Sequence, residues 1–153
     1  MIEKSKIENI VNEYIKGTDI FPVAVKVSST NRISVIIDTF NGILLEQCAD
    51  LHRHIETILD RNSVDFELQV SSPGLDAHFA VIEQYRKYEN RKVEVVDSSG
   101  ERFTGVLKNV TKGGFELETE IRIKGKKTEK LDKSFNFDQV KSAKAIYSII
   151  KGN

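Results

Sequence analysis

Apolar residues in the first part of the chain recur with two different periods. Between residues 5 and 16 they come every three or four positions, which predicts an amphipathic helix with one buried stripe. We expect Ser5 to cap this helix and Gly17 to end it. Residues 21–27 (FPVAVKV) and 32–38 (RISVIID) alternate with a period of two, and the polar turn between them predicts an antiparallel hairpin.

The same two periods return in the next stretch. Apolar side chains from Leu45 to Asp60 predict a second helix, and residues 66–70 (FELQV) alternate as a third strand. Because crossover connections are right-handed, the third strand should lie parallel to the second. The result is a small mixed sheet with both helices on one face, a layout that resembles KH-like and other RNA-associated modules.

The second half of the chain is dominated by alternation with a period of two. A short helix over residues 79–89 is expected to join the two halves. Five strands are then predicted, at residues 92–97, 102–110, 115–123, 134–140 and 144–150, with the basic segment 125–130 as a mobile loop. Such short strands favour a small barrel, because a closed barrel leaves no exposed edge.

These elements predict an α+β fold in two domains. Residues 1–83 form an N-terminal αββαβ, KH-like domain, and residues 84–153 form a small C-terminal Sm-like or SH3-like β-barrel. The formal net charge is zero, but the first domain has 7 lysines and arginines against 13 aspartates and glutamates, and the second has 16 against 10. The acidic half suits a basic protein partner, and the basic half suits nucleic-acid phosphates or an acidic protein.

Composition narrows the class of protein further. The chain has 153 residues, no apolar run of membrane-helix length and a charged start unlike a secretory signal, so we expect a cytoplasmic location. Its one cysteine, Cys48, excludes an intrachain disulfide. Cys48 and His52 are one helical turn apart, but His54 lies on another face, and two ligands make no metal site. No Walker loop occurs either, so we expect no metal and no other cofactor.

The most unusual stretch is SSPGLDAHF, residues 71–79, which follows the third predicted strand. Its serines, Asp76 and His78 are residue types of a hydrolase triad, but close neighbours in sequence rarely converge as a triad requires. A strand–turn–helix order could instead place free N–H groups around an anion, although the stretch contains no lysine or arginine.

A structural turn explains most of the same stretch without any chemistry. Pro73 would fix φ, Gly74 would adopt a positive φ, and Asp76 would cap the following helix. The turn leaves unexplained why two serines stand beside the apolar Leu75 at a domain junction.

Basic residues gather in two places in the second half of the chain. One group, at the junction, comprises Arg86, Lys87, Arg91 and Lys92, and the other, around the predicted loop, comprises Arg122, Lys124, Lys126, Lys127, Lys130 and Lys133. Either group could neutralise RNA phosphates, and an ordinary solvated surface is an equally weighted alternative. Glu116, Glu118 and Glu120 are expected to give one strand an acidic outer face that is unsuited to phosphate.

VSSPGLD, residues 70–76, resembles the signature of the RimP family of ribosome maturation factors. The resemblance covers nearly the whole chain in order and spacing, through RISVIID, the glycine-led helix with Cys48, NRKVEVV, RFTGVLKNV and FDQVKSAKA. It implies an N-terminal α+β domain and a C-terminal Sm-like barrel. Two departures stand out: Ala77-His78 replaces the family's usual Arg-Pro, and Gly114-Phe115 replaces the nucleotide-contacting asparagine of Sm proteins. We therefore expect no Sm base pocket.

The function implied by the resemblance is that of a non-catalytic assembly factor, which binds the immature small ribosomal subunit. The acidic half would face a basic ribosomal protein near the decoding centre, and the barrel would face ribosomal RNA. Contact or hinge residues would be Ser71, Ser72, Pro73, Gly74, Leu75 and Asp76, and phosphate contacts would be Arg86, Lys87, Arg91, Lys92, Lys124, Lys126 and Lys127. We expect a monomer, because the N-terminal domain would obstruct an Sm-type ring.

Two alternatives to this function stay open. One is a free-standing Sm-like or KH-like module that binds other RNAs, which predicts affinity for naked RNA with a steep salt dependence. The other, less favoured, is a hydrolase that uses Ser71 or Ser72 with His78.

Overall fold

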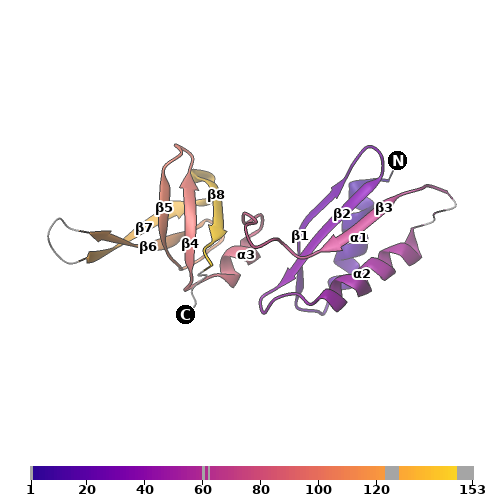
Figure 1. The fold of residues 1–153 in the computed structure, drawn as a ribbon, viewed down its shortest axis with the longest axis horizontal. Helices are drawn as coiled ribbons and strands as arrows, with labels where there is room; N and C mark the ends of the chain where they lie inside the picture. The colour runs from indigo at the N-terminus through magenta and orange to yellow at the C-terminus, as the bar shows by residue number, and fades with distance from the viewer. Residues whose placement is uncertain (1, 60, 62, 123–127, 148–153) are drawn as a thin grey trace. The chain divides into compact units, whose positions relative to one another are not determined.

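The chain divides into two compact units, Met1–Gly74 and Leu75–Asn153. A computed structural model describes residues 2–59, 61, 63–122 and 128–147, and we describe each unit by itself (Figure 1). The segment 75–83, which the sequence analysis assigned to the first domain, belongs to the second compact unit. That the chain forms two independently folding domains with a boundary at residue 83 stays a prediction.

The first unit is a three-stranded sheet with two helices. Its elements are α1 (Lys4–Ile15), β1 (Ile20–Val27), β2 (Arg32–Thr39), α2 (Leu45–Ile58) and β3 (Glu67–Ser71). The strand order is β1-β2-β3, with β1 antiparallel and β3 parallel to β2 (Figure 1). The predicted element order, strand directions and α+β class are therefore confirmed.

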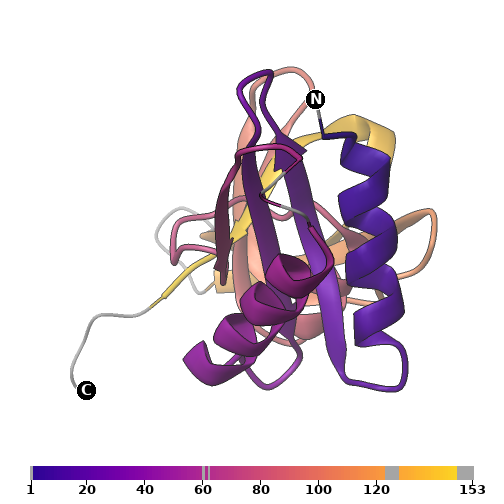
Figure 2. The same cartoon turned by 90° about the vertical axis from the view of Figure 1, so that its right-hand side faces the viewer.

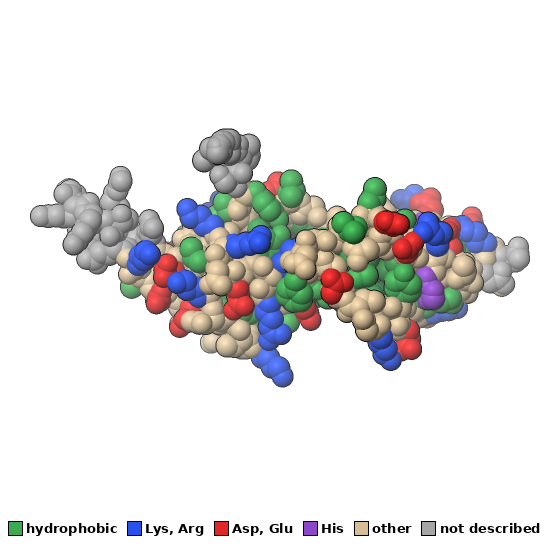
Figure 3. All heavy atoms as spheres, turned by 90° about the horizontal axis from the view of Figure 1, so that it is seen from below, with side chains coloured by type: hydrophobic (Ala, Val, Ile, Leu, Met, Phe, Trp, Pro, Cys, Tyr) green, Lys and Arg blue, Asp and Glu red, His purple; other side chains and the backbone are tan. Residues whose placement is uncertain are grey.

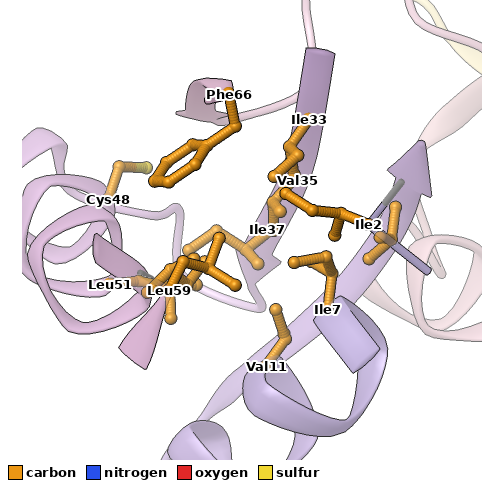
Figure 4. Packing of buried hydrophobic residues seen from close by; sticks show 12 residues of the cluster. Ile2, Ile7, Val11, Ile33, Val35, Ile37, Cys48, Leu51, Leu59 and Phe66 are labelled. Carbon is orange, nitrogen blue, oxygen red and sulfur yellow. The ribbon is translucent and has the colours of Figure 1, made fainter. Parts of the chain in front are cut away.

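Both helices pack on the same face of this sheet. Alternate residues of β2 point to that face because successive side chains of a strand point to opposite sides. Ile33, Val35 and Ile37 are buried there (Figure 4). They meet buried side chains of α1, Ile7 and Val11, and of α2, Cys48, Leu51 and Ile55. Figure 2 shows the two helices beside the strands.

The ends of α1 differ in part from the prediction. Glu3 is the N-cap residue and makes no side-chain cap hydrogen bond, so Ser5 lies inside the helix and its predicted capping role is wrong. At the other end, Gly17 has a φ of 78°, a conformation that glycine adopts without the strain of a Cβ atom. Gly17 therefore ends the helix region as expected.

The second unit contains one short helix and a five-stranded antiparallel sheet. The elements are α3 (Ile82–Lys87), β4 (Lys92–Asp97), β5 (Arg102–Lys108), β6 (Gly114–Arg122), β7 (Thr128–Asn136), the 3-10 turn η1 (Phe137–Gln139) and β8 (Val140–Ala145). The strand order is β7-β6-β5-β4-β8. Among the strands that the structure describes, no ladder joins β7 to β8, so the predicted closure of the barrel is not seen.

Three segments of the second unit differ from the prediction. The helix predicted from residue 79 begins only at Ile82, because the Phe79 N–H donates to the Ala143 carbonyl oxygen at 2.7 Å, outside any helix. The last two strands lie earlier than predicted, because η1 separates β7 from β8. Of the predicted loop 125–130, residues 125–127 lie outside the described residues, and the rest begin β7.

The core of the second unit is rich in aromatic rings. Tyr85, Phe115 and Phe135 are buried together with aliphatic residues of β4, β5 and β6. The Tyr85 ring lies 5.3 Å from that of Phe115, which lies 5.4 Å from that of Phe135. Offset or tilted pairs at such distances stabilise a core beyond the burial of apolar area alone. This core holds α3 and its flanking basic residues against the sheet.

Candidate functional site

The segment Ser71–Asp76 begins as a strand and continues as an irregular chain. Ser71 is the last residue of β3 and pairs with Ile36 of β2, so its side chain points to the face of the sheet opposite the helices. Ser72 and Gly74 are exposed, and Leu75 and Asp76 form a turn with the apolar Leu75 side chain 73% exposed. The segment thus offers accessible groups but no enclosed cavity among its described residues.

The structure corrects two details of the expected turn. Positive φ values occur at Gly17, Gly42 and Gly100 but not at Gly74, so Gly74 does not adopt the expected conformation. Asp76 does not cap a helix, because α3 begins six residues later with Val81 as its N-cap residue. The Asp76 carboxylate instead lies 4.0 Å from Lys144 Nζ, and this exposed ion pair contributes little stability.

The hydrolase alternative gains no support from the described geometry. Ser71 ends β3 and Ser72 follows it in the first unit, whereas His78 belongs to the second. A triad needs its base within hydrogen-bond reach of the nucleophile.

The residues considered for a metal site have structural partners instead. His52 Nε2 lies 3.1 Å from the Leu68 carbonyl oxygen, and the His54 ring packs at 4.7 Å on Tyr14. Burial, and secondarily the charge of Asp38, raise the pKa of the Cys48 thiol, which disfavours the thiolate that a metal would bind. Within the described part of the chain, no group of three such ligands comes together.

The basic residues at the junction lie in two places: Arg86, Lys87 and Arg91 lie in or just after α3, and Lys92 lies on the sheet. Lys87 Nζ and Arg91 Cζ lie 5.6 and 5.8 Å from the centroid of the Tyr88 ring, within the range of a cation–π interaction. Arg86 is exposed in the last turn of α3. Lys92 starts β4 and belongs to a different group, on the sheet.

Lys92 lines a groove of about 360 Å³ on the outer face of the sheet. The other lining residues are Thr104, Gly105, Val106, Glu118 and Lys130. Cross-strand pairing assembles this groove, because Lys92 pairs with Val106 and Val106 pairs with Glu118. Gly105 lets β5 and β6 approach closely, since a Cβ atom there would lie 2.5 Å from the Glu118 carbonyl oxygen.

Glu118 holds two further cations at the groove. Its Oε2 atom accepts a hydrogen bond from Lys108 Nζ at 2.9 Å, and its Oε1 atom lies 3.8 Å from Lys130 Nζ. The hydrogen bond from Lys108 is the main cause that lowers the pKa of Glu118, and it also raises the pKa of Lys108. Of the charged residues that line the groove, two are lysines, Lys92 and Lys130, and one is a carboxylate, Glu118. The outer face therefore carries Glu116 and Glu118, as expected, and the lining of this groove adds two lysines to it.

Lys124, Lys126 and Lys127 lie outside the described residues. Gly114 is buried, and a Cβ atom on it would overlap the Phe135 carbonyl oxygen, so β6 has no space for an asparagine side chain at this position.

Charges of both signs mix on the surface. On the face shown in Figure 3, lysine and arginine side chains lie among aspartate and glutamate side chains on each unit. A nucleic-acid contact would therefore use local groups such as the Lys92 groove, because this face is not uniformly basic. No helix among the described residues combines the length and apolar character that crossing a bilayer requires.

Comparison with known proteins identifies the family. Residues 6–76 match the model of the RimP N-terminal domain. A ribosome maturation factor RimP from Porphyromonas gingivalis is 33% identical over 124 residues, which cover 81% of this chain and 82% of the relative. Proteins of the same name from Flavobacterium psychrophilum and Christiangramia forsetii are 28% and 26% identical, over 62% and 78% of each chain. The chain belongs to the RimP family.

Proposed function

We propose that this protein is a non-catalytic assembly factor that binds the immature small ribosomal subunit in the cytoplasm and promotes its maturation. Membership of a family whose relatives are named ribosome maturation factors supports the role in ribosome assembly. The observation that carries the RNA side of the proposal is the groove around Lys92. Its lysines suit a phosphate backbone, which is a recurring anionic feature of ribosomal RNA.

The groove would contact RNA without reading its sequence. Lys108 and Lys130 both pair with Glu118, and Lys92 and Lys130 line the groove with exposed side chains. Lysine ammonium groups bind phosphate as point charges and carry no base specificity. Arg86, Lys87 and Arg91 would form a second contact beside Tyr88. Such contacts suit a factor that recognises the shape of a folded RNA.

A binding factor of this kind promotes maturation by shifting an equilibrium. It binds an immature conformation of the subunit more tightly than the mature one, and it dissociates when the favoured conformation is lost. In this proposal the protein acts as a monomer, and the segment Ser71–Asp76 serves as a hinge or as an additional contact. A basic ribosomal protein near the decoding centre is the proposed partner of the acidic N-terminal unit.

The double substitution Lys92→Glu and Lys130→Glu tests the RNA contact. We expect it to weaken binding to immature small subunits by about two orders of magnitude at low salt, because two phosphate attractions become repulsions. The slope of the logarithm of the binding constant against the logarithm of salt concentration should fall by about 2. Titration of labelled protein with purified subunits at several salt concentrations measures both quantities.

Lys141→Glu is the matched control, because Lys141 is exposed in β8 of the same unit and lies outside the groove lining. Equal losses for the control and the groove variant would contradict a specific role for the groove. If the wild type bound naked RNA as tightly as immature subunits, a free-standing RNA-binding module would replace the assembly factor as the better account.

A further inference from the structure

Three large apolar side chains are exposed on the connection between β2 and α2 and at the first residue of α2. Phe40, Leu44 and Leu45 are 47%, 64% and 88% exposed. Phe40 rests with its ring 5.3 Å from that of the buried Phe21, so it is held in place while one side faces solvent. On the side of the molecule in Figure 3, hydrophobic side chains reach the surface of the first unit between charged ones. We call these three residues the apolar knob.

The folding of the unit does not explain the apolar knob. Leu44 is the N-cap residue of α2, a position where serine, threonine, asparagine or aspartate would stabilise the helix. A leucine has no oxygen to accept a helix N–H, and the Leu44 N–H itself donates to Gln47 Oε1 at 2.8 Å. Leu45 is almost fully exposed and contributes little to the core. Residues that lower the stability of a helix and expose apolar area to water are typical of an interaction surface.

The charges beside the knob indicate the class of partner. The β1–β2 ladder ends with Ile20 paired to Thr39, so Asp19 and Phe40 are the next residues of the two strands. Glu46 lies in the first turn of α2, directly after Leu45. The first unit as a whole, residues 1–74, has 11 aspartates and glutamates against 7 lysines and arginines. These carboxylates would repel RNA phosphate and a second copy of the same unit, and they would attract a cationic segment.

We propose that the apolar knob is a docking surface for a basic protein segment that inserts or receives an apolar side chain. The exposed leucines would supply the desolvated centre of the contact, and Asp19 and Glu46 would pair with lysine or arginine at its rim. This inference deepens the proposed function, because it rests on the small ribosomal subunit being the bound object. The RNA groove and the knob would then hold different components of the same particle.

The double substitution Leu44→Ser and Leu45→Ser tests the knob without endangering the fold. Both side chains are mostly exposed, and serine at the N-cap position should stabilise α2 slightly. The probe is the RNA-free protein fraction stripped from purified small subunits, with naked small-subunit RNA tested in parallel. We expect the full-length variant to bind the protein fraction at least about tenfold more weakly than the wild type, and to bind the RNA equally well.

Two companion variants sharpen the test. Glu46→Lys should weaken binding to the protein fraction several-fold and most strongly at low salt, because it reverses a rim charge. Ile58→Ser is the matched control, since Ile58 is 45% exposed at the other end of α2 and should leave binding unchanged.

The possible outcomes separate the inference from the proposed function. Loss of RNA binding by the leucine variant, or a wild-type dimer that this variant dissociates, would overturn the inference. Unchanged binding of the variant to the protein fraction would also overturn it, even if the wild type binds immature subunits and the proposed function stands. If the wild type binds the protein fraction through the knob but binds no subunits, the proposed function fails and the docking surface remains.

Discussion

Replacing Leu51 by alanine is expected to lower the free energy of unfolding of the first unit by about 3 kcal/mol. Leu51 has no exposed surface and packs in the core between α2 and the sheet (Figure 4). Removing the methine and the two methyl carbons of leucine loses their transfer free energy and leaves a cavity, because the side chains of β2 cannot fully collapse into the space. Urea titration followed by circular dichroism measures the change.

Leu45→Ala provides the control for this substitution. The chemical change is the same and lies in the same helix, but Leu45 is 88% exposed. We expect its effect on the free energy of unfolding to stay within about 0.5 kcal/mol. Similar effects of the two leucine substitutions would show that α2 does not pack on the sheet as described.

Replacing Gly114 by alanine is expected to destabilise the second unit by about 2–4 kcal/mol. Gly114 pairs with Asn136 at the start of the β6–β7 ladder, and a Cβ atom on it would overlap the Phe135 carbonyl oxygen. Relief of this overlap requires the two backbones to separate, which weakens ladder hydrogen bonds and the packing of the buried Phe135 ring. Thermal unfolding followed by circular dichroism, with amide spectra to assign the loss to the second unit, measures the effect.

The neighbouring Gly113 supplies a control of the same kind. It is exposed, and a Cβ atom on it would meet no atom within 4 Å. Neither glycine has a positive φ, so backbone strain from that source does not distinguish them. Gly113→Ala should therefore leave the unfolding temperature nearly unchanged, and a loss equal to that of Gly114→Ala would contradict the close β6–β7 approach.

Hydrophobic periodicity predicted most of the helices and strands, because the burial of one face of an element determines the spacing of its apolar residues. The alternation of Ile33, Val35 and Ile37 follows from one face of β2 packing under two helices. Periodicity failed near Phe137, where η1 interrupts the alternation. There the Asn136 N–H donates to Gln139 Oε1 at 2.8 Å, a side-chain contact that no pattern of apolar residues can indicate.

The candidate site was less predictable because strand pairing assembles it. Lys92 was identified from its basic neighbours along the chain, yet its partners at the groove come from β5, β6 and β7. The sequence placed Glu118 on an acidic outer face, but it could not indicate that Lys108 and Lys130 pair with this carboxylate. The apolar knob was missed because exposed and buried leucines look alike in a helical pattern.

Sedimentation of a cell lysate through a sucrose gradient tests the central claim most directly. The claim is that this protein binds the small ribosomal subunit before maturation is complete. The predicted result is that the protein comigrates with free small subunits and is missing from translating ribosomes, whereas the Lys92→Glu, Lys130→Glu variant stays near the top of the gradient. A wild-type protein that stays at the top, or spreads evenly over subunits and translating ribosomes, would contradict the account.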